Sequence, residues 1–132
     1  PLAPAPAEWL PWIPAACGIA VLLGHLFPAW HGFRGGKGVA TVGGTLLALS
    51  PLLSAAAIAC WLLTLVAGRY VSVASIVTAG LLPAGALLLW FFGGNPALLA
   101  YTLIAGVLVL VAHRRNIARL RAGTEPRLMV RR

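Results

Sequence analysis

The stretch GVATVGGTLLALSPLLSAAAIACWLLTLVAG, residues 38–68, decides how this chain is arranged, because it carries no charge from end to end. As one helix it would be roughly 45 Å long, whereas the hydrocarbon core of a bilayer is about 30 Å thick. Pro51, preceded by Ser50, divides the stretch into a short piece, 39–50, and a longer one, 52–68. We therefore expect two helices here, with a break at which the chain can reverse direction.

The composition of the whole chain indicates a membrane environment. Of its 132 residues, 61% are hydrophobic and only 9% are charged, whereas about 25% of the residues in a soluble domain are charged. Its only acidic residues are Glu8 and Glu125. The net charge of +8 could attract nucleic acid, but no nucleic-acid-binding motif accompanies it. The sequence predicts an integral membrane protein that contacts membrane lipids and binds no nucleic acid.

Three further apolar runs have the length of membrane crossings. They cover residues 12–30, 71–92 and 97–113. Tryptophans stand near the ends of the first run, as aromatic residues do at membrane interfaces, and GGNP at 93–96 predicts a turn between the other two. The expected fold is a single integral-membrane domain over residues 1–132, an all-α, polytopic transmembrane helical bundle.

The distribution of positive charge predicts the orientation of this bundle. Seven of the ten basic residues lie from Arg114 onward, and Arg34 and Lys37 lie in the loop at 31–38. The positive-inside rule places both regions in the cytoplasm, which requires an even number of crossings between them. A reversal near Pro51 satisfies this requirement and brings Arg69 to the same side. The piece after the glycine loop is then a short broken or re-entrant helix, buried against its neighbours.

The loop FRGGKGVAT, residues 33–41, has the composition of an anion cradle. Glycines allow successive N–H groups to turn toward one point, and a helix beginning near Val39 would add its positive dipole end. Arg34 and Lys37 add formal charge. The loop is not a Walker A motif, because glycine follows the lysine. The alternative is a flexible turn whose charges only anchor topology. The glycines concerned are Gly35, Gly36 and Gly38.

The segment VAHRRNIARLRAGTEPRL, residues 111–128, is the second polar motif. His113 ends an apolar run, and Asn116 lies three residues later on the same face if the helix continues. An imidazole and a carboxamide in this relation can polarise a hydroxyl and stabilise a developing oxyanion. The alternative for His113 is an ordinary interfacial residue. Gly123 and Pro126 are expected to end this helix.

Other polar residues have weaker functional interpretations. Ser72 and Ser75 share a helical face, where they can bind a neighbouring helix or offer hydroxyls to the anion. His25 can hydrogen-bond a neighbouring helix, and His31 is a loop residue. No carboxylate is spaced to complete a histidine metal site, so we expect no metal.

Three segments together resemble one family, the bacterial membrane acyl-phosphate:glycerol-3-phosphate acyltransferases (the PlsY family). They are GHLFPAWHGFRGGKGVAT at 24–41, RYVSVASI at 69–76 and HRRNIARLRAGTE at 113–125. The resemblance implies transfer of a fatty acyl group from acyl phosphate to the 1-hydroxyl of glycerol 3-phosphate, giving lysophosphatidic acid for phospholipid synthesis. It also implies a multi-pass protein of the bacterial plasma (inner) membrane, with the active site facing the cytoplasm.

The resemblance also implies roles for individual residues. Gly35, Gly36, Lys37 and Gly38 would hold glycerol phosphate, and His113 and Asn116 would organise the reaction centre. Since acyl phosphate is already activated, positioning and charge stabilisation suffice and no cofactor is required. Contact with the soluble enzyme that makes acyl phosphate stays open as a partner interaction.

The chain departs from the family pattern at three points. Arg115 stands where an acidic residue is common, and Arg34 where lysine is frequent. No segment matches the family's loop rich in serine, glycine and asparagine, so we expect that loop upstream of Pro1 with additional transmembrane helices. The chain is then the C-terminal two-thirds of the enzyme. The alternative function is a non-catalytic membrane module or transporter fragment that binds a phosphate compound.

Overall fold

The chain folds into a helical bundle in the computed structural model, which describes residues 6–128. Every regular element in this range is a helix. Short 3-10 helices cover Ala7–Trp9 and Ala29–His31, and the α-helices are α1 (Trp12–Leu26), α2 (Val39–Leu49), α3 (Pro51–Gly68), α4 (Val71–Phe91), α5 (Pro96–Ala112) and α6 (Arg114–Arg121). The proline-rich start lies partly outside the described residues, and the last two arginines of the tail lie wholly outside them.

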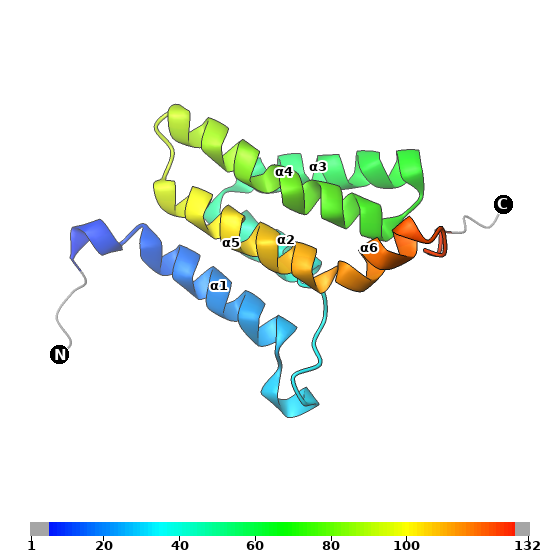
Figure 1. The fold of residues 1–132 in the computed structure, drawn as a ribbon. Helices are drawn as coiled ribbons and strands as arrows, with labels where there is room; N and C mark the ends of the chain where they lie inside the picture. Colours follow the sequence, from blue (N-terminus) through cyan, green and yellow to red (C-terminus); the bar gives the residue numbers. More distant parts are fainter. Residues whose placement is uncertain (1–5, 129–132) are drawn as a thin grey trace.

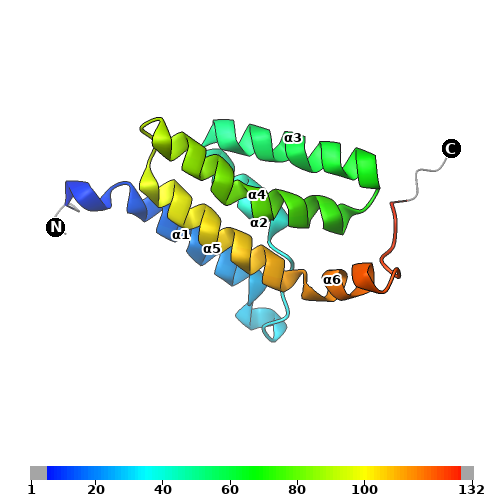
Figure 2. The same ribbon diagram turned by 45° about the horizontal axis from the view of Figure 1, so that its top comes forward.

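Helix α5 lies at the centre of the arrangement (Figure 1). It packs most extensively against α4, and α1 lies along another side of it. Helix α2 fills the space beside α1 and α5, and α3 covers α2 and α4 from outside. Figure 2 shows α6 continuing beyond α5 at an angle, and the axes of these two helices differ by 56°.

The lengths and compositions of the helices fit a membrane protein. Three segments are long and apolar enough to cross a bilayer, namely Trp12–His31, α3 and α4, and the bent pair α5–α6 makes a fourth candidate. Helix α2 has 11 residues and spans about 16 Å, too little for a crossing of its own. The expected all-α, polytopic bundle with a short helix after the glycine loop is therefore confirmed.

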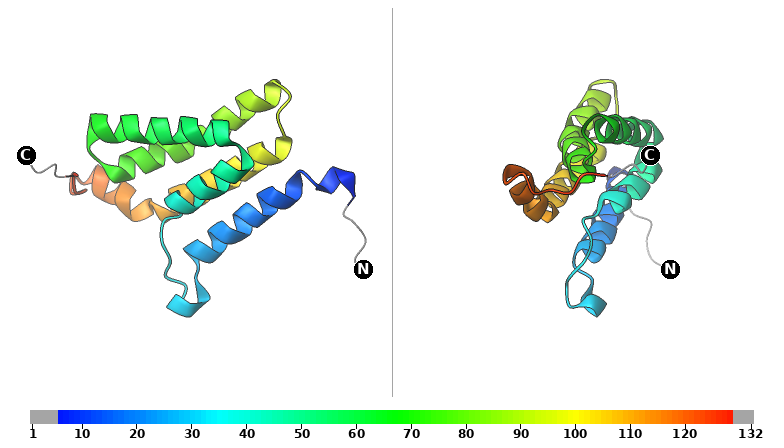
Figure 3. Two further views of the ribbon diagram at one scale, coloured as in Figure 1. Left: turned by 180° about the vertical axis from the view of Figure 1, so that it is seen from behind. Right: turned by 90° about the vertical axis from the view of Figure 1, so that its right-hand side faces the viewer.

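The predicted break at Pro51 is present and reverses the chain. Helix α2 ends at Leu49, Ser50 has an extended backbone, and Pro51 occupies the first turn of α3. The Ser50 hydroxyl accepts a hydrogen bond from the N–H of Leu53, which caps the new helix. Helix α3 then runs back beside α2 (Figure 3). The loop at 31–38, the α3–α4 turn and α6 consequently lie at one end of the bundle.

The first helix is shorter than its apolar run. The sequence predicts one span over residues 12–30, but α1 ends at Leu26. Phe27 leaves the helical conformation because Pro28 follows it, and the residue before a proline avoids the α region. A 3-10 turn over Ala29–His31 completes the apolar stretch. The glycine loop therefore begins with a turn that folds back toward the end of α1.

The interior of the bundle combines apolar side chains such as Leu22 and Leu46 with small polar ones, whereas many other large apolar side chains point outward. Ser54 and Thr102 are completely buried, whereas Leu63 and Val66 of α3 are more than 70% exposed. Exposed leucine and valine on this scale suit a protein whose surroundings are lipid rather than water. Small residues at the contacts allow the helices to approach closely.

The α4–α5 contact supplies a test of this packing. A Cβ atom at Gly106 of α5 would lie 2.8 Å from the backbone oxygen of Ala79 in α4, so the two helices would have to separate. We expect Gly106→Ala to lower the free energy of unfolding by about 1–3 kcal/mol, measured by thermal unfolding in detergent. Gly80→Ala is the control, because a Cβ atom there meets nothing within 4 Å. Equal unfolding temperatures for the two variants would contradict the packing account.

Candidate active site

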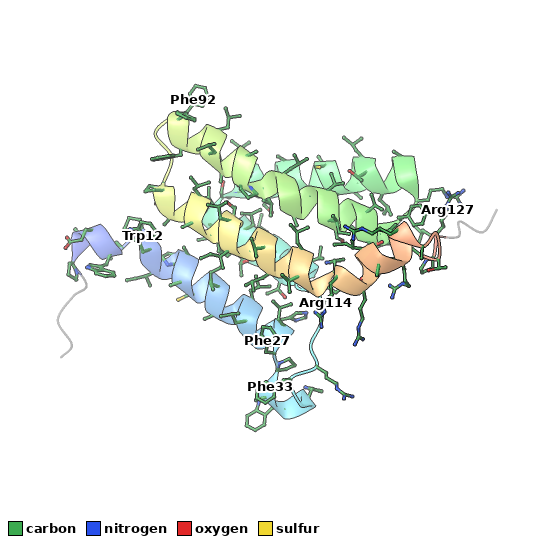
Figure 4. The ribbon with its side chains drawn as sticks, in the orientation of Figure 1. Trp12, Phe27, Phe33, Phe92, Arg114 and Arg127 are labelled. Atoms are coloured by element: carbon green, nitrogen blue, oxygen red, sulfur yellow. The ribbon has the colours of Figure 1, made fainter. Side chains whose placement is uncertain are left out.

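A cleft of about 730 Å³ opens at the basic end of the bundle, between the glycine loop and the α5–α6 junction. Five basic side chains line it, and among the described residues no acidic side chain does. In Figure 4, Phe27 and Phe33 mark the loop side of this region, and Arg114 marks the junction of α5 with α6. The cleft therefore favours an anionic ligand. Its basic residues are Arg34, Lys37, Arg114, Arg115 and Arg119.

The glycine loop forms one wall of the cleft through Arg34, Gly35, Gly36 and Lys37. Its backbone is fastened to the end of α1, because the N–H of Gly36 donates a 3.3 Å hydrogen bond to the carbonyl of His25. Gly36 therefore offers no free N–H group. The predicted binding of glycerol phosphate by Gly35, Gly36, Lys37 and Gly38 stays a prediction, and in this structure the Gly36 N–H is engaged by α1.

Gly38 serves the loop through its backbone conformation. Its φ of +78° is left-handed, which suits glycine, and α2 begins at the next residue, as predicted. A Cβ atom at Gly38 would also lie 2.5 Å from a methyl group of Leu22. No side chain caps the first turn of α2. Gly38 does not line the cleft, but its turn fixes where Lys37 leaves the loop.

Asn116 reaches the cleft from α6 and is held by Glu125. The Nδ2 atom of Asn116 donates to Glu125 Oε1 at 2.7 Å, and the Nε atom of Arg119 donates to Glu125 Oε2 at 2.7 Å. Because a carboxylate only accepts, this contact fixes which end of the carboxamide faces Glu125. The second N–H of the carboxamide and its oxygen stay available to a ligand.

The turn after α6 brings Glu125 back onto that helix. Gly123 has a φ of +69°, and the N–H of Thr124 donates to the carbonyl of Arg119 at 2.9 Å. The expected helix end before Gly123 is confirmed, since α6 stops at Arg121. Sequence reasoning alone gives Glu125 no role. The available signal is its rarity, because it is one of only two acidic residues in the chain.

The environment of Glu125 keeps it ionised. Burial alone would raise the pKa of this carboxyl group, but the Ser72 hydroxyl, Asn116 and Arg119 stabilise the charge and lower the pKa to about 2. The Ser72 hydroxyl is near the carboxylate yet makes no hydrogen bond of good geometry within the described residues. We therefore attribute the specific contacts to Asn116 and Arg119, and only a weaker electrostatic effect to Ser72.

His113 lies at the bend between α5 and α6 and is only 1% exposed. Its Nδ1 atom is 2.8 Å from the carbonyl oxygen of Val109. Since that oxygen can only accept, Nδ1 carries the proton and Nε2 keeps a lone pair. His113 does not line the cleft, although its neighbours Ala112 and Arg114 do. The predicted His113–Asn116 pair is thus divided between the interior and the cleft wall.

Four other predicted residues lie away from the cleft lining. The Ser75 hydroxyl donates a hydrogen bond to the Val71 carbonyl and accepts one from the Trp61 indole, so it is already engaged as donor and as acceptor within the bundle. No group of three potential metal ligands occurs in residues 6–128. Substrate binding by the two serines stays a prediction. Neither of the two histidines lines the cleft. The residues are Ser72, Ser75, His25 and His31.

Fold and cleft together define an all-helical integral membrane protein with a cation-lined site at one end. The family model for glycerol-3-phosphate acyltransferase matches residues 2–123, so the chain belongs to that family. The glycerol-3-phosphate acyltransferase of Geobacter sulfurreducens is 44% identical over 117 residues, covering 89% of this chain and 58% of that protein. The corresponding protein of Methylorubrum extorquens is 46% identical over 113 residues, covering 86% of this chain and 54% of its own.

The solved structures agree with these relatives. The crystal structure of PlsY, an integral membrane glycerol 3-phosphate acyltransferase, in its glycerol 3-phosphate form matches with a TM-score of 0.79 and 38% sequence identity. The match covers 88% of this chain and 56% of that one. The lysophosphatidic acid form of the same protein matches equally well. The chain thus spans a little over half the length of the proteins to which it is similar.

The contacts of Glu125 predict a defined response to acid. Its pKa in the folded protein lies below its ordinary value of 4.5, so its stabilising contribution is complete above about pH 4.5 and is lost as the pH falls toward 2. We expect Glu125→Gln to lower stability at neutral pH by about 1.5–3 kcal/mol. Thermal unfolding in detergent should show the variant and the wild type converging at low pH. A constant difference from pH 7 to pH 2.5 would refute the assignment.

Proposed function

We propose that the full-length protein transfers a fatty acyl group from acyl phosphate to the 1-hydroxyl of glycerol 3-phosphate, giving lysophosphatidic acid for phospholipid synthesis. The observation that carries this proposal is the convergence of Lys37 and Asn116 on one basic cleft. Family membership and the similarity to a glycerol 3-phosphate-bound structure support the choice of acceptor. The choice of acyl phosphate as donor is what the resemblance to the acyl-phosphate-dependent family implies, and the basic lining of the cleft is compatible with it.

The cleft suits two phosphate compounds at once. Its volume of about 730 Å³ exceeds what one three-carbon phosphate needs. Arg34 and Lys37 approach from the glycine loop, and Arg114, Arg115 and Arg119 approach from the α5–α6 side. Arginine binds phosphate through two parallel hydrogen bonds, and lysine supplies a compact charge. We assign the glycerol phosphate to the loop side, near Lys37, and the phosphate of the donor to Arg114 and Arg115.

The proposed reaction requires little beyond positioning. The 1-hydroxyl oxygen of glycerol 3-phosphate attacks the carbonyl carbon of acyl phosphate, and a new ester bond forms. The bond between that carbon and the phosphate oxygen breaks, and phosphate leaves with the electron pair. The free N–H of Asn116 is placed to donate to the carbonyl oxygen as negative charge develops on it. Positive charge around the leaving phosphate lowers the barrier further.

The hydroxyl proton has two candidate acceptors, namely His113 and a phosphate oxygen of the substrates. His113 has a free lone pair on Nε2, but its ring is buried behind the cleft wall. This burial favours the phosphate oxygen as the acceptor. His113 then acts by holding the α5–α6 bend, and the bend positions Asn116.

We further propose that the cleft faces the cytoplasm of the bacterial plasma membrane. The α3–α4 turn with Arg69, the glycine loop and α6 lie at one end of the bundle, and this end carries nearly all of the described positive charge. By the positive-inside rule that end is cytoplasmic. A cleft at this position is accessible to water-soluble glycerol 3-phosphate and to the soluble enzyme that makes acyl phosphate.

Replacement of Lys37 tests the proposed function. In the full-length enzyme we expect Lys37→Ala to lower kcat/KM for glycerol 3-phosphate by about 100-fold or more, because the fixed charge that holds the phosphate of this substrate is lost. The measurement is lysophosphatidic acid formation from acyl phosphate in membranes or detergent.

Arg121→Ala is the matched control, since it removes one positive charge from α6 outside the cleft lining. Near wild-type rates for Lys37→Ala would remove the loop from the mechanism. If the full-length protein bound glycerol 3-phosphate without turning it over, the non-catalytic alternative would replace the acyltransferase proposal.

A further inference from the structure

The imidazole of His25 lies against the glycine loop at the point where the loop passes the end of α1. A Cβ atom at Gly36 would lie 2.2 Å from His25 Nε2, 3.0 Å from Cε1 and 3.2 Å from Cδ2. The ring edge therefore occupies the space that any larger residue at position 36 would need. Within residues 6–128 this ring makes no hydrogen bond, so its contact with Gly36 is one of packing.

The same residue holds the loop in a second way. The backbone carbonyl of His25 accepts the hydrogen bond from the N–H of Gly36. A Cβ atom at Gly35 would lie 2.1 Å from that carbonyl oxygen and 2.5 Å from the carbonyl oxygen of Leu26. Gly35 thus packs on the backbone of α1, whereas Gly36 packs on a side chain. The two adjacent glycines are required for physically different reasons.

We propose that the His25 side chain is a positioning residue for the glycine loop and sets the place from which Lys37 addresses the glycerol phosphate. His25 does not line the cleft, so it acts through Gly36, which does. Gly36 is bonded covalently to Lys37, and a glycine backbone without an external stop samples many conformations. The ring supplies that stop. This inference rests on the proposed function, because its readout is the binding of glycerol 3-phosphate.

His25 is exposed on its other sides, although it lies in the last turn of α1. Its replacement by alanine therefore leaves no enclosed cavity and should leave the bundle folded. The loop would still be attached through the His25 carbonyl, but Gly36 would lose its lateral contact. We expect His25→Ala to raise KM and Kd for glycerol 3-phosphate several-fold and to leave kcat nearly unchanged, as weakened ground-state positioning predicts.

A pair of glycine variants separates side-chain packing from backbone packing. In the full-length enzyme, Gly36→Ala should lower kcat/KM for glycerol 3-phosphate by about tenfold or more, because the new methyl group collides with the His25 ring. Adding His25→Ala removes the ring and should bring kcat/KM back up to the level of His25→Ala alone. Gly35→Ala should be at least as damaging, and His25→Ala should not rescue it, because the collision there is with backbone oxygens.

The measurements are kcat and KM with acyl phosphate, Kd for glycerol 3-phosphate by calorimetry, and monodispersity on gel filtration. Rescue of Gly36→Ala but not of Gly35→Ala supports the inference. If Gly36→Ala fails to fold, a higher yield and restored monodispersity of the double variant count as rescue. Equal rescue of both glycine variants, rescue of neither, or an unchanged KM and Kd in His25→Ala would overturn it. If the wild type binds glycerol 3-phosphate but makes no product, the transfer reaction fails while the Kd pattern still decides the role of His25. A wild type that binds no glycerol 3-phosphate overturns both proposals.

Discussion

The length that a bilayer allows a helix is the constraint on which the arrangement of this protein depends. An unbroken helix through residues 38–68 would place the glycine loop and α6 at opposite ends of the bundle. The extended backbone of Ser50 and the ring of Pro51 instead end α2 after about 16 Å. Helix α3 then returns beside it. A single interruption of the backbone thus brings Lys37 and Asn116 to one cleft.

The end of the bundle that carries the cleft is formed by the ends of several helices. Phe27 ends α1 before a proline, Gly38 begins α2 in a left-handed turn, and His113 marks the bend of 56° into α6. At each interruption a polar side chain or a backbone group becomes accessible, whereas in a continuous helix it would be covered. Irregular backbone at this depth is tolerated only where protein or a polar cleft covers it. Breaks in the apolar helices therefore coincide with the site.

The elements that can be predicted from the sequence are those whose ends are marked by prolines, glycines or charged residues. Pro51 and Val39 predict the ends of α2, and the positive charges predict which ends of the helices lie together. Local signals could not reveal the clamp of Glu125 on Asn116, which depends on the left-handed turn at Gly123. They also could not show that the Gly36 N–H is already used by α1. Such pairings are decided by tertiary contacts, which no single segment encodes.

The charges of the cleft can be counted against those of the proposed substrates. Arg119 is neutralised by Glu125, whose two oxygens are occupied by Arg119 and Asn116. The other four basic residues of the cleft make no ion pair among residues 6–128. Two phosphate groups carry about −2 each when fully ionised, so together they would balance these four charges. An acidic residue without a partner at this end would compete with the phosphates for the same cations. That competition explains why an ionised glutamate is tolerated here only with both of its oxygens bound.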